Sequence, residues 1–278
     1  MIQEAISNID EIQVKKLLQS VFEKYGYDFS DYSPASIKRR ISRFLINNKF
    51  QNIEELEEAL INNPLLLGNF IEEITVNVTE MYRDPAFYKS LIQDVFPTLA
   101  LQPIIRIWHA GCSTGEEVFS LAILLHEAGL LHKSLLYGTD LNQGVLHAAM
   151  KRTYSKSTLK TDSENYISSG GIQKLSDYYS ETENTIKFHD FLSKHMVFSN
   201  HNLSIDQSFN EFNLILCRNV LIYFNRNLQD KVFKLFTESM ADKSFLALGT
   251  KETLEFSSVA EQFDIVNKNN RIWKVKKS

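Results

Sequence analysis

The segment from residue 104 to residue 129 constrains the fold more than any other part of the chain. Ile104–Trp108 is a short apolar run, typical of a strand buried in a parallel sheet. A turn of small residues, Ala110–Gly115, follows it. Glu116–Glu127 then carries apolar residues at helical spacing, and Gly129 can end that helix. The segment predicts a strand, a tight turn and a helix, which is the unit that binds nucleotides in doubly wound sheets.

The same alternation continues toward the C-terminus and predicts an α/β fold with a doubly wound sheet. The further strand-like and helix-like segments are Leu135–Thr139, Leu141–Lys151, Phe212–Leu216, Leu228–Met240 and Phe245–Gly249. Phe263–Val266 and Ile272–Val275 flank a polar turn, so we expect the sheet to end with an antiparallel strand. Residues 155–200 interrupt the pattern and predict a small β insertion, with short strands at Thr185–Phe188 and Met196–Phe198.

Residues 1–75 predict a separate, small all-α domain, because apolar residues recur at helical spacing and no strand-like alternation occurs before Ile74. Ser33 and Pro34 suit the start of a helix. The apolar face of that helix is formed by Ile37, Ile41, Phe44 and Leu45. The expected domains are therefore 1–75 for the helical domain, 76–90 for a linker that contributes to a ligand site, and 91–278 for the α/β domain with its insertion.

Charge and cysteine content exclude several classes of protein. The net charge of −4 argues against nucleic acid as the main partner. No apolar run approaches the ~20 residues of a membrane span, and the N-terminus has no signal-peptide pattern. Cys112 and Cys217 are far apart and suit reduced thiols, so we expect a cytoplasmic location. The histidines lack metal-ligand spacing, so we expect no metal site.

Acidic residues directly after the small-residue turn restrict its ligand. In a dinucleotide enzyme the pyrophosphate occupies this helix N-terminus, and Glu116 and Glu117 would repel it. The ligand expected at this turn therefore has no phosphate there and can be cationic. S-adenosylmethionine fits this description, because it has no phosphate and carries a positive sulfonium. Asp140, at the end of the second predicted strand, is placed to accept hydrogen bonds from ribose hydroxyls. The alternative is that the two glutamates only complement the helix dipole and that Asp140 only caps the next helix.

Four ordered motifs resemble those of the CheR-type chemotaxis receptor methyltransferases. They are Asn77–Asp84 (NVTEMYRD), Trp108–Glu117 (WHAGCSTGEE), Gly138–Leu141 (GTDL) and Leu216–Phe224 (LCRNVLIYF). The resemblance covers nearly the whole chain. It implies a class I methyltransferase-like sheet, S-adenosylmethionine as cofactor, and an enzyme that esterifies glutamate side chains on chemoreceptors.

The resemblance also implies roles for individual residues. The implied cofactor-binding residues are Asn77, Thr79, Arg83, Gly111, Glu117, Asp140, Asn202, Leu203, Arg218 and Asn219. Arg83 and Tyr223 would lie nearest the transferred methyl group and are the implied catalytic residues. Simpler interpretations remain open: Thr79 as a helix cap, Arg83 as one half of a surface ion pair, Tyr223 as core, and Asn202 as a turn residue.

Methyl transfer to a carboxylate needs alignment more than proton transfer. A glutamate side chain is already ionised at neutral pH, so no general base is required. Near-attack alignment can contribute ~7–11 kcal/mol. An arginine can orient one carboxylate oxygen through a charge-assisted hydrogen bond, which is the role we expect for Arg83.

A basic stretch in the helical domain predicts the docking surface for an acidic receptor helix. It consists of Lys38, Arg39, Arg40 and Arg43, although a merely solvated charged face would have the same composition. Some family members also tether to a receptor pentapeptide through a glycine-containing loop of the insertion. Glu181–His195 contains no glycine, so we expect an enzyme that acts without this tether. We also expect the enzyme to be a monomer. Gly249–Glu252 (GTKE) departs from the family's more usual His-Ser-Glu after that glycine.

Three competing functions remain open at this point. The first is a methyltransferase of the same fold that acts on another protein or a small molecule. The second is a non-catalytic regulator that binds S-adenosylmethionine. The third is a nicotinamide oxidoreductase, which the acidic pair after the turn disfavours.

Overall fold

The computed structural model describes residues 9–75 and 78–276. Contacts within the chain divide it into two compact units. The first unit contains residues 1–76 together with Tyr223–Lys231, and the second contains Asn77–Ile222 together with Val232–Ser278. Asn77, one of the implied cofactor-binding residues, lies outside the described residues.

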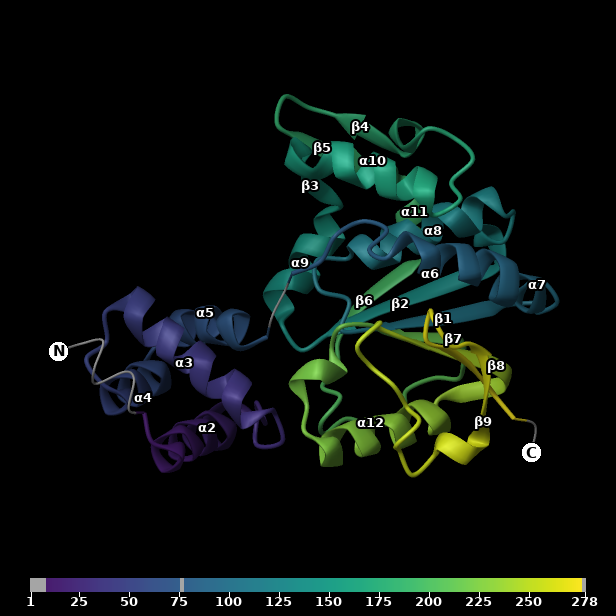
Figure 1. Ribbon diagram of the computed structural model, residues 1–278. Helices are drawn as coiled ribbons and strands as arrows, with labels where there is room; N and C mark the ends of the chain where they lie inside the picture. Colours follow the sequence, from purple (N-terminus) through teal and green to yellow (C-terminus); the bar gives the residue numbers. More distant parts are fainter. Residues whose placement is uncertain (1–8, 76–77, 277–278) are drawn as a thin grey trace. The chain divides into compact units, whose positions relative to one another are not determined.

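The N-terminal part of the first unit is helical, as the sequence predicts. Its helices are α2 (Glu11–Tyr25), α3 (Pro34–Asn48), α4 (Ile53–Asn62) and α5 (Pro64–Ile74) (Figure 1). Asp10 accepts a hydrogen bond from the backbone N–H of Ile12 at the start of α2, and Gly26 ends that helix in the left-handed conformation. Pro64 begins α5, where a missing N–H costs nothing.

The second unit is built on a seven-stranded sheet with the order β6-β2-β1-β7-β8-β10-β9. The strands are β1 (Ile105–Ala110), β2 (Ser134–Asp140), β6 (Met196–Asn200), β7 (Phe212–Cys217), β8 (Met240–Leu248), β9 (Phe263–Asn267) and β10 (Ile272–Val275). Pairing is parallel from β6 through β8, and β10 is antiparallel to both β8 and β9. The predicted doubly wound sheet with an antiparallel end is therefore confirmed.

Helices lie on both sides of this sheet. In Figure 1, α6, α7 and α8 lie on one side and α12 on the other. The helices that follow α5 in the chain are α6 (Pro85–Ser90), η1 (Leu91–Val95), α7 (Phe96–Leu99), α8 (Glu116–Glu127), α9 (Gln143–Lys151), α10 (Leu159–Ser168), α11 (Asp190–Ser193) and α12 (Arg226–Glu238), of which α12 begins in the first unit and ends in the second. Short 3₁₀ turns are η2 (Leu131–Lys133), η3 (Lys156–Thr158), η4 (Leu175–Tyr178), η5 (Leu221–Tyr223) and η6 (Ala260–Gln262).

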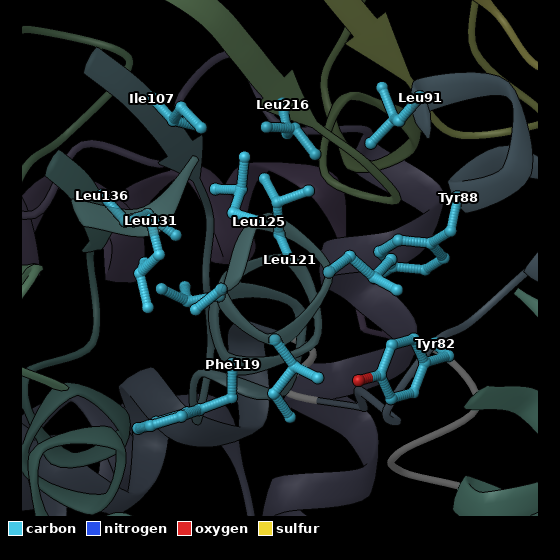
Figure 2. Packing of buried hydrophobic residues seen from close by; sticks show 14 of the residues in the cluster. Tyr82, Tyr88, Leu91, Ile107, Phe119, Leu121, Leu125, Leu131, Leu136 and Leu216 are labelled. Atoms are coloured by element: carbon cyan, nitrogen blue, oxygen red, sulfur yellow. The ribbon is translucent and has the colours of Figure 1, made fainter. Parts of the chain in front are cut away.

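The core of the second unit surrounds α8. Its residues from Val118 to Leu125 are all buried, so this part of the helix is covered on every side, and Ser120 is its only polar residue. Figure 2 shows Leu121 and Leu125 between Leu216 and the aromatic rings of Tyr82 and Tyr88. Helix α6, predicted as part of a linker, contributes Tyr88 to this core. Residues 85–90 therefore belong to the α/β unit and are not a linker.

The insertion is shorter than the sequence pattern suggested. Three short strands, β3 (Thr153–Ser155), β4 (Tyr179–Glu181) and β5 (Thr185–Phe188), form a separate antiparallel sheet in the order β3-β5-β4. Strand β6, which the predicted range of 155–200 included, pairs in parallel with β2 and is the edge of the main sheet. The sequence did not reveal this pairing because it joins segments about sixty residues apart.

The residues that the structure describes contain neither a candidate membrane-spanning helix nor a candidate metal site. None of their helices has both the length and the hydropathy that a membrane span requires. None of their His, Cys, Asp and Glu side chains gather in a group of three or more suited to holding a metal ion.

Candidate functional site

Apart from Asn77, Thr79 and Arg83, the predicted site residues of the second unit follow the carboxyl ends of its central strands. In the sheet, β2 and β6 lie on one side of β1, and β7 and β8 lie on its other side. The order therefore reverses between β1 and β7, and ligands bind in the crevice outside such a switch point. The loops after these two strands are the glycine loop, Ala110–Gly115, and the switch loop, Arg218–Ile222.

Tight backbone geometry brings the glycine loop close to the switch loop. Gly111 and Gly115 have φ of 78° and 92°, in the left-handed region that glycine adopts without strain. The N–H groups of Gly111 and Cys112 both donate to the carbonyl of Thr139, at 2.8 and 2.9 Å. A Cβ on Gly111 would lie 2.4 Å from Val220 Cγ2, so any side chain there would push the two loops apart.

The acidic pair at the start of α8 is divided between two environments. Glu116 is half-buried and accepts from the Thr114 hydroxyl at 2.6 Å, and burial raises its pKa. Glu117 Oε1 lies 2.9 Å from His109 Nδ1, and its Oε2 accepts from Arg218 Nη1 at 3.2 Å. Burial opposes ionisation of Glu117, but the hydrogen bond from His109 and the charges of His109 and Arg218 outweigh it, so its pKa is lowered.

Arg218 links Glu117 to the Arg83–Asp84 turn. Its Nη2 donates to Asp84 Oδ2 at 2.7 Å and to the carbonyl of Arg83 at 3.2 Å. Its guanidinium lies 4.0 Å from the centre of the Phe87 ring. The side chain of Arg218 is only 2% exposed. Its contacts join the start of α8, the Arg83–Asp84 turn and α6.

The carboxylate of Asp140 accepts hydrogen bonds from backbone N–H groups of the glycine loop and of the start of α9. Oδ2 accepts from Ser113 of the glycine loop at 2.9 Å, and Oδ1 accepts from Asn142 at 3.0 Å. Burial raises the pKa of Asp140, and these backbone hydrogen bonds oppose that rise. Asn142 itself is the N-cap of α9, so Asp140 does support the start of that helix. A carboxylate has about four acceptor positions, so this structural role leaves acceptor positions for ribose hydroxyls.

Asn202 and Leu203 follow β6 and are buried. The N–H of His201, one residue earlier, donates to the carbonyl of Asp140 at 3.2 Å, which holds this segment beside β2. Asn202 Oδ1 accepts from the N–H and the hydroxyl of Ser204, at 3.0 and 2.7 Å. The turn interpretation of Asn202 is therefore correct for its oxygen, and its cofactor role stays a prediction.

Arg83 and Thr79 lie on the segment before α6, and both are half-buried. Arg83 Nη1 is 3.5 Å from the carbonyl of Val78, and in the described part of the chain it makes no ion pair with a carboxylate. The alternative of a surface ion pair is therefore not what the structure shows. Neighbouring Tyr82 and Asp84 both have positive φ, and the N–H of Tyr82 donates to Ser120 Oγ at 3.0 Å, which fixes the turn to α8.

Tyr223 lies in the first unit, directly after the switch loop. Its ring is half-exposed, with the guanidinium of Arg40 at 5.5 Å from the ring centre. Asn219, in the second unit, adopts φ of 62° at the start of the switch loop. The catalytic role of Tyr223 and the cofactor role of Asn219 stay predictions.

Sequence reasoning missed one buried group of this site, Glu252. It lies in the loop after β8 and accepts backbone N–H groups from four residues: Gly249, Asn219, Val220 and Ile222, at 2.6–3.3 Å. The only signal in the sequence was that the segment Gly249–Glu252 departs from the family's usual motif at its two middle positions but keeps the glutamate. Its hydrogen-bond partners are 30–33 residues away in the chain, except for Gly249, so spacing alone could not reveal them.

The structure corrects the predicted docking surface at Arg40. Arg40 is only 8% exposed and donates from Nη1 to the carbonyl of Glu73 at 2.9 Å. Helical spacing explains this, because Arg40 falls three residues after Ile37 and therefore on the apolar face. Arg39 and Arg43 are exposed, and Arg43 pairs with Glu73 at 2.5 Å. The predicted docking surface is therefore reduced to Lys38, Arg39 and Arg43, and its role stays a prediction.

The chemistry of these residues fits S-adenosylmethionine. Gly111 and Gly115 have no room for a side chain, because Val220 and Ala149 occupy the space beside them, so the glycine loop is packed tightly at both positions. Two carboxylates begin α8, where a phosphate would be repelled, and the ionised Glu117 suits the ligand's ammonium group. Asp140 supplies buried acceptors at the end of the neighbouring strand. His109, the nearest candidate base, is buried and already bound to Glu117.

The lowered pKa of Glu117 predicts a pH-dependent contribution to stability. A carboxyl whose folded-state pKa lies below its ordinary value of 4.5 stabilises the fold above pH ~4.5, and this contribution is lost as the pH falls through the folded-state pKa. Glu117→Gln should lower the free energy of unfolding by ~1–3 kcal/mol at pH 7 and by less at pH 3.5. Urea denaturation at both pH values measures this, with exposed Glu255→Gln as the control. A difference that stays constant or grows on acidification would contradict the assigned pairing.

Comparison with known proteins places the chain in a family. Residues 77–272 match the family model described as "CheR methyltransferase, SAM binding domain", and residues 12–75 match "CheR methyltransferase, all-alpha domain". The chain is 39% identical to the Pseudomonas putida protein named Cher3 over 95% of this chain and 97% of that protein. It is 32% identical to the "Chemotaxis protein methyltransferase" of Listeria innocua over 82% of this chain and 85% of that protein.

A solved structure of a SAM-dependent methyltransferase from Geobacter sulfurreducens is also similar, with a TM-score of 0.33, 13% identity, and coverage of 63% of this chain and 51% of that one. The family assignment itself depends on the matches of sequence over both parts of the chain. This chain belongs to the CheR methyltransferases, and S-adenosylmethionine is its cofactor.

Proposed function

We propose that this protein transfers a methyl group from S-adenosylmethionine to glutamate side chains in the cytoplasmic helical domains of chemoreceptors, and forms glutamate methyl esters. The observation that carries the proposal is that the backbone of Arg83 is held in place while its guanidinium forms no ion pair within the described residues. Its backbone is bonded to Arg218, which in turn binds Glu117, whereas its guanidinium makes no ion pair with a carboxylate of the described chain. A guanidinium available beside the cofactor residues suits an acceptor that is itself a carboxylate.

The names of relatives support the same class of acceptor. Proteins named "Chemotaxis protein methyltransferase" in Listeria innocua and Salmonella typhimurium match 82% and 92% of this chain. A chemoreceptor acceptor also agrees with the basic residues exposed on α3.

The reaction would proceed by in-line displacement without a general base. When bound, the cofactor supplies an electrophilic methyl group on a sulfonium. Asp140 would hold the ribose hydroxyls, and Glu117 the ammonium group. Arg83 would orient one oxygen of the acceptor carboxylate. The catalytic role of Tyr223, which belongs to the first unit, stays a prediction. The acceptor is already ionised at neutral pH, so these residues only need to align it.

Docking of the receptor is proposed to use Lys38, Arg39 and Arg43. Arg39→Glu tests this surface most cleanly, because Arg43→Glu would also break the pair with Glu73. An exposed ion pair contributes ~0.2–1 kcal/mol, so we expect the KM for the receptor to rise about two- to fivefold per residue. The rise should shrink at high salt, since exposed charges are screened.

Steady-state methylation assays at low and high salt measure this docking effect, with the affinity for S-adenosylhomocysteine as the internal control. Lys49→Glu, at the exposed end of α3, is a matched charge reversal outside the proposed surface. An unchanged KM in Arg39→Glu would rule this residue out as a docking contact.

We further propose that the enzyme acts as a monomer and without a pentapeptide tether. The connection between β4 and β5 contains no glycine, and Thr182 closes it by hydrogen bonds with Thr185. A rigid turn of this kind does not offer the glycine-containing loop that tethered family members carry.

Transfer of a radiolabelled methyl group to purified receptor signalling domains tests the function directly. We expect label in the receptor that is released as methanol at alkaline pH, because a carboxyl methyl ester is base-labile. Label that resists alkali, or that enters a protein other than the receptor, would replace this proposal with another acceptor of the same enzyme class.

A further inference from the structure

The loop after β8 reaches back to the switch loop through one buried carboxylate. Glu252 Oε2 accepts the N–H groups of Gly249 and Asn219, at 2.6 and 3.0 Å. Its Oε1 accepts those of Val220 and Ile222, at 2.9 and 3.3 Å. Asn219 has φ of 62°, a conformation that helps successive N–H groups converge on one acceptor. Glu252 is 4% exposed, so these four hydrogen bonds are formed away from water.

Two close approaches depend on this arrangement. A Cβ on Gly249 would lie 2.7 Å from Glu252 Oε2 and 2.8 Å from the backbone nitrogen of Asn219, so only glycine leaves room for the carboxylate. On the other side of the switch loop, Val220 Cγ2 occupies the space beside Gly111 of the glycine loop. The carboxylate, the switch loop and the glycine loop are therefore in contact in that order.

We propose that Glu252 is a positioning residue for cofactor binding, which holds the switch loop against the glycine loop so that Gly111 and Asn219 face the ligand in the correct geometry. The inference rests on the cofactor site proposed above. Glu252 acts through the backbone of the switch loop, and it lies on neither of the two strands whose loops form the crevice.

An ionised carboxylate is the side chain this position needs. It can accept four N–H groups because it has about four acceptor positions and no donor. A glutamine offers one oxygen, and its NH₂ group would face two N–H donors. Glu252→Gln should therefore release part of the switch loop while changing the volume of the side chain very little.

The test is a calorimetric titration of the full-length protein with S-adenosylhomocysteine. Glu252→Gln and Gly249→Ala should each weaken binding about tenfold or more, because each breaks the same contact from opposite sides. Val220→Ala, which leaves Glu252 intact and is half-exposed, should weaken binding about threefold. In methylation assays Glu252→Gln should raise the KM for S-adenosylmethionine by the same factor and leave the KM for the receptor within twofold of wild type.

The matched control is Glu127→Gln. Glu127 accepts from the Tyr178 hydroxyl at 2.9 Å and from the N–H of Gln173 at 3.2 Å, and it joins the insertion to the far end of α8. Its loss should lower the melting temperature without changing cofactor affinity. A protein that is only less stable loses active molecules and therefore Vmax, whereas its KM is unchanged.

Two results would overturn the proposal. One is wild-type affinity for S-adenosylhomocysteine in a folded Glu252→Gln protein, or in Val220→Ala should the other variants fail to fold. The other is an equal loss of affinity in Glu127→Gln, which would make the effect one of general stability. The titration uses no acceptor protein, so it decides the role of Glu252 even if no receptor is methylated.

Discussion

Arg83→Ala is expected to reduce the kcat for methyl transfer by ~10²–10³-fold, the usual effect of removing one aligned donor from a reaction centre. The fold should be retained, because Arg83 is half-exposed and its guanidinium makes no ion pair in the described part of the chain. Its carbonyl, which accepts from Arg218, is backbone and stays in place in the variant. Single-turnover methylation and thermal unfolding measure the two quantities separately.

Arg83→Lys separates charge from geometry. A lysine keeps the positive charge but cannot reproduce the two-pronged contact that a guanidinium makes with a carboxylate. We expect it to recover only a small part of the rate. A titration with S-adenosylhomocysteine then distinguishes the two roles implied for Arg83, since a purely acceptor-aligning residue leaves cofactor affinity unchanged. A rate near wild type in Arg83→Ala would remove Arg83 from the catalytic residues.

Asp140→Asn is expected to weaken the binding of S-adenosylhomocysteine by roughly 10²-fold. Hydrogen bonds to a charged group contribute ~1.5–3 kcal/mol each, and the two ribose hydroxyls would both lose their ionised acceptor. The asparagine NH₂ group would also face one of the two backbone N–H groups that Asp140 now accepts, from Ser113 and Asn142. Isothermal titration calorimetry measures the affinity, and urea denaturation measures the accompanying loss of stability.

Asp177→Asn is the matched control for this variant. Asp177 accepts the backbone N–H of Lys174 at 3.3 Å in the insertion, so the same substitution there disturbs a similar contact away from the carboxyl ends of the central strands. We expect wild-type affinity from it. Unchanged affinity in a folded Asp140→Asn protein would mean that Asp140 only supports the glycine loop and the start of α9.

Local patterns in the sequence were sufficient for all strands of the main sheet except β6, and they predict a site at the carboxyl ends of these strands. The apolar run before the glycine loop corresponds to β1. The helical spacing of apolar residues after the loop corresponds to α8. Arg40 falls three residues after Ile37, so helical spacing was enough to predict that it faces inward. The prediction failed because Arg40 was grouped with its basic neighbours in the chain. Strand β6 was assigned to the insertion because a short strand carries no local sign of its partner.

By itself the sequence determined the α/β fold, the separate helical domain and, through four motifs, the family. It also predicted the residues that carry the chemistry, among them the two glutamates after the small-residue turn and the carboxylate after β2. Periodicity and turn chemistry act over a few residues, so they are readable from neighbours in the chain. Only the tertiary structure decided how these groups are held. The pairing of Glu117 with His109 and Arg218, and the four N–H groups gathered by Glu252, join segments brought together by the sheet. Such contacts depend on the packing of distant elements, which no spacing along the chain encodes.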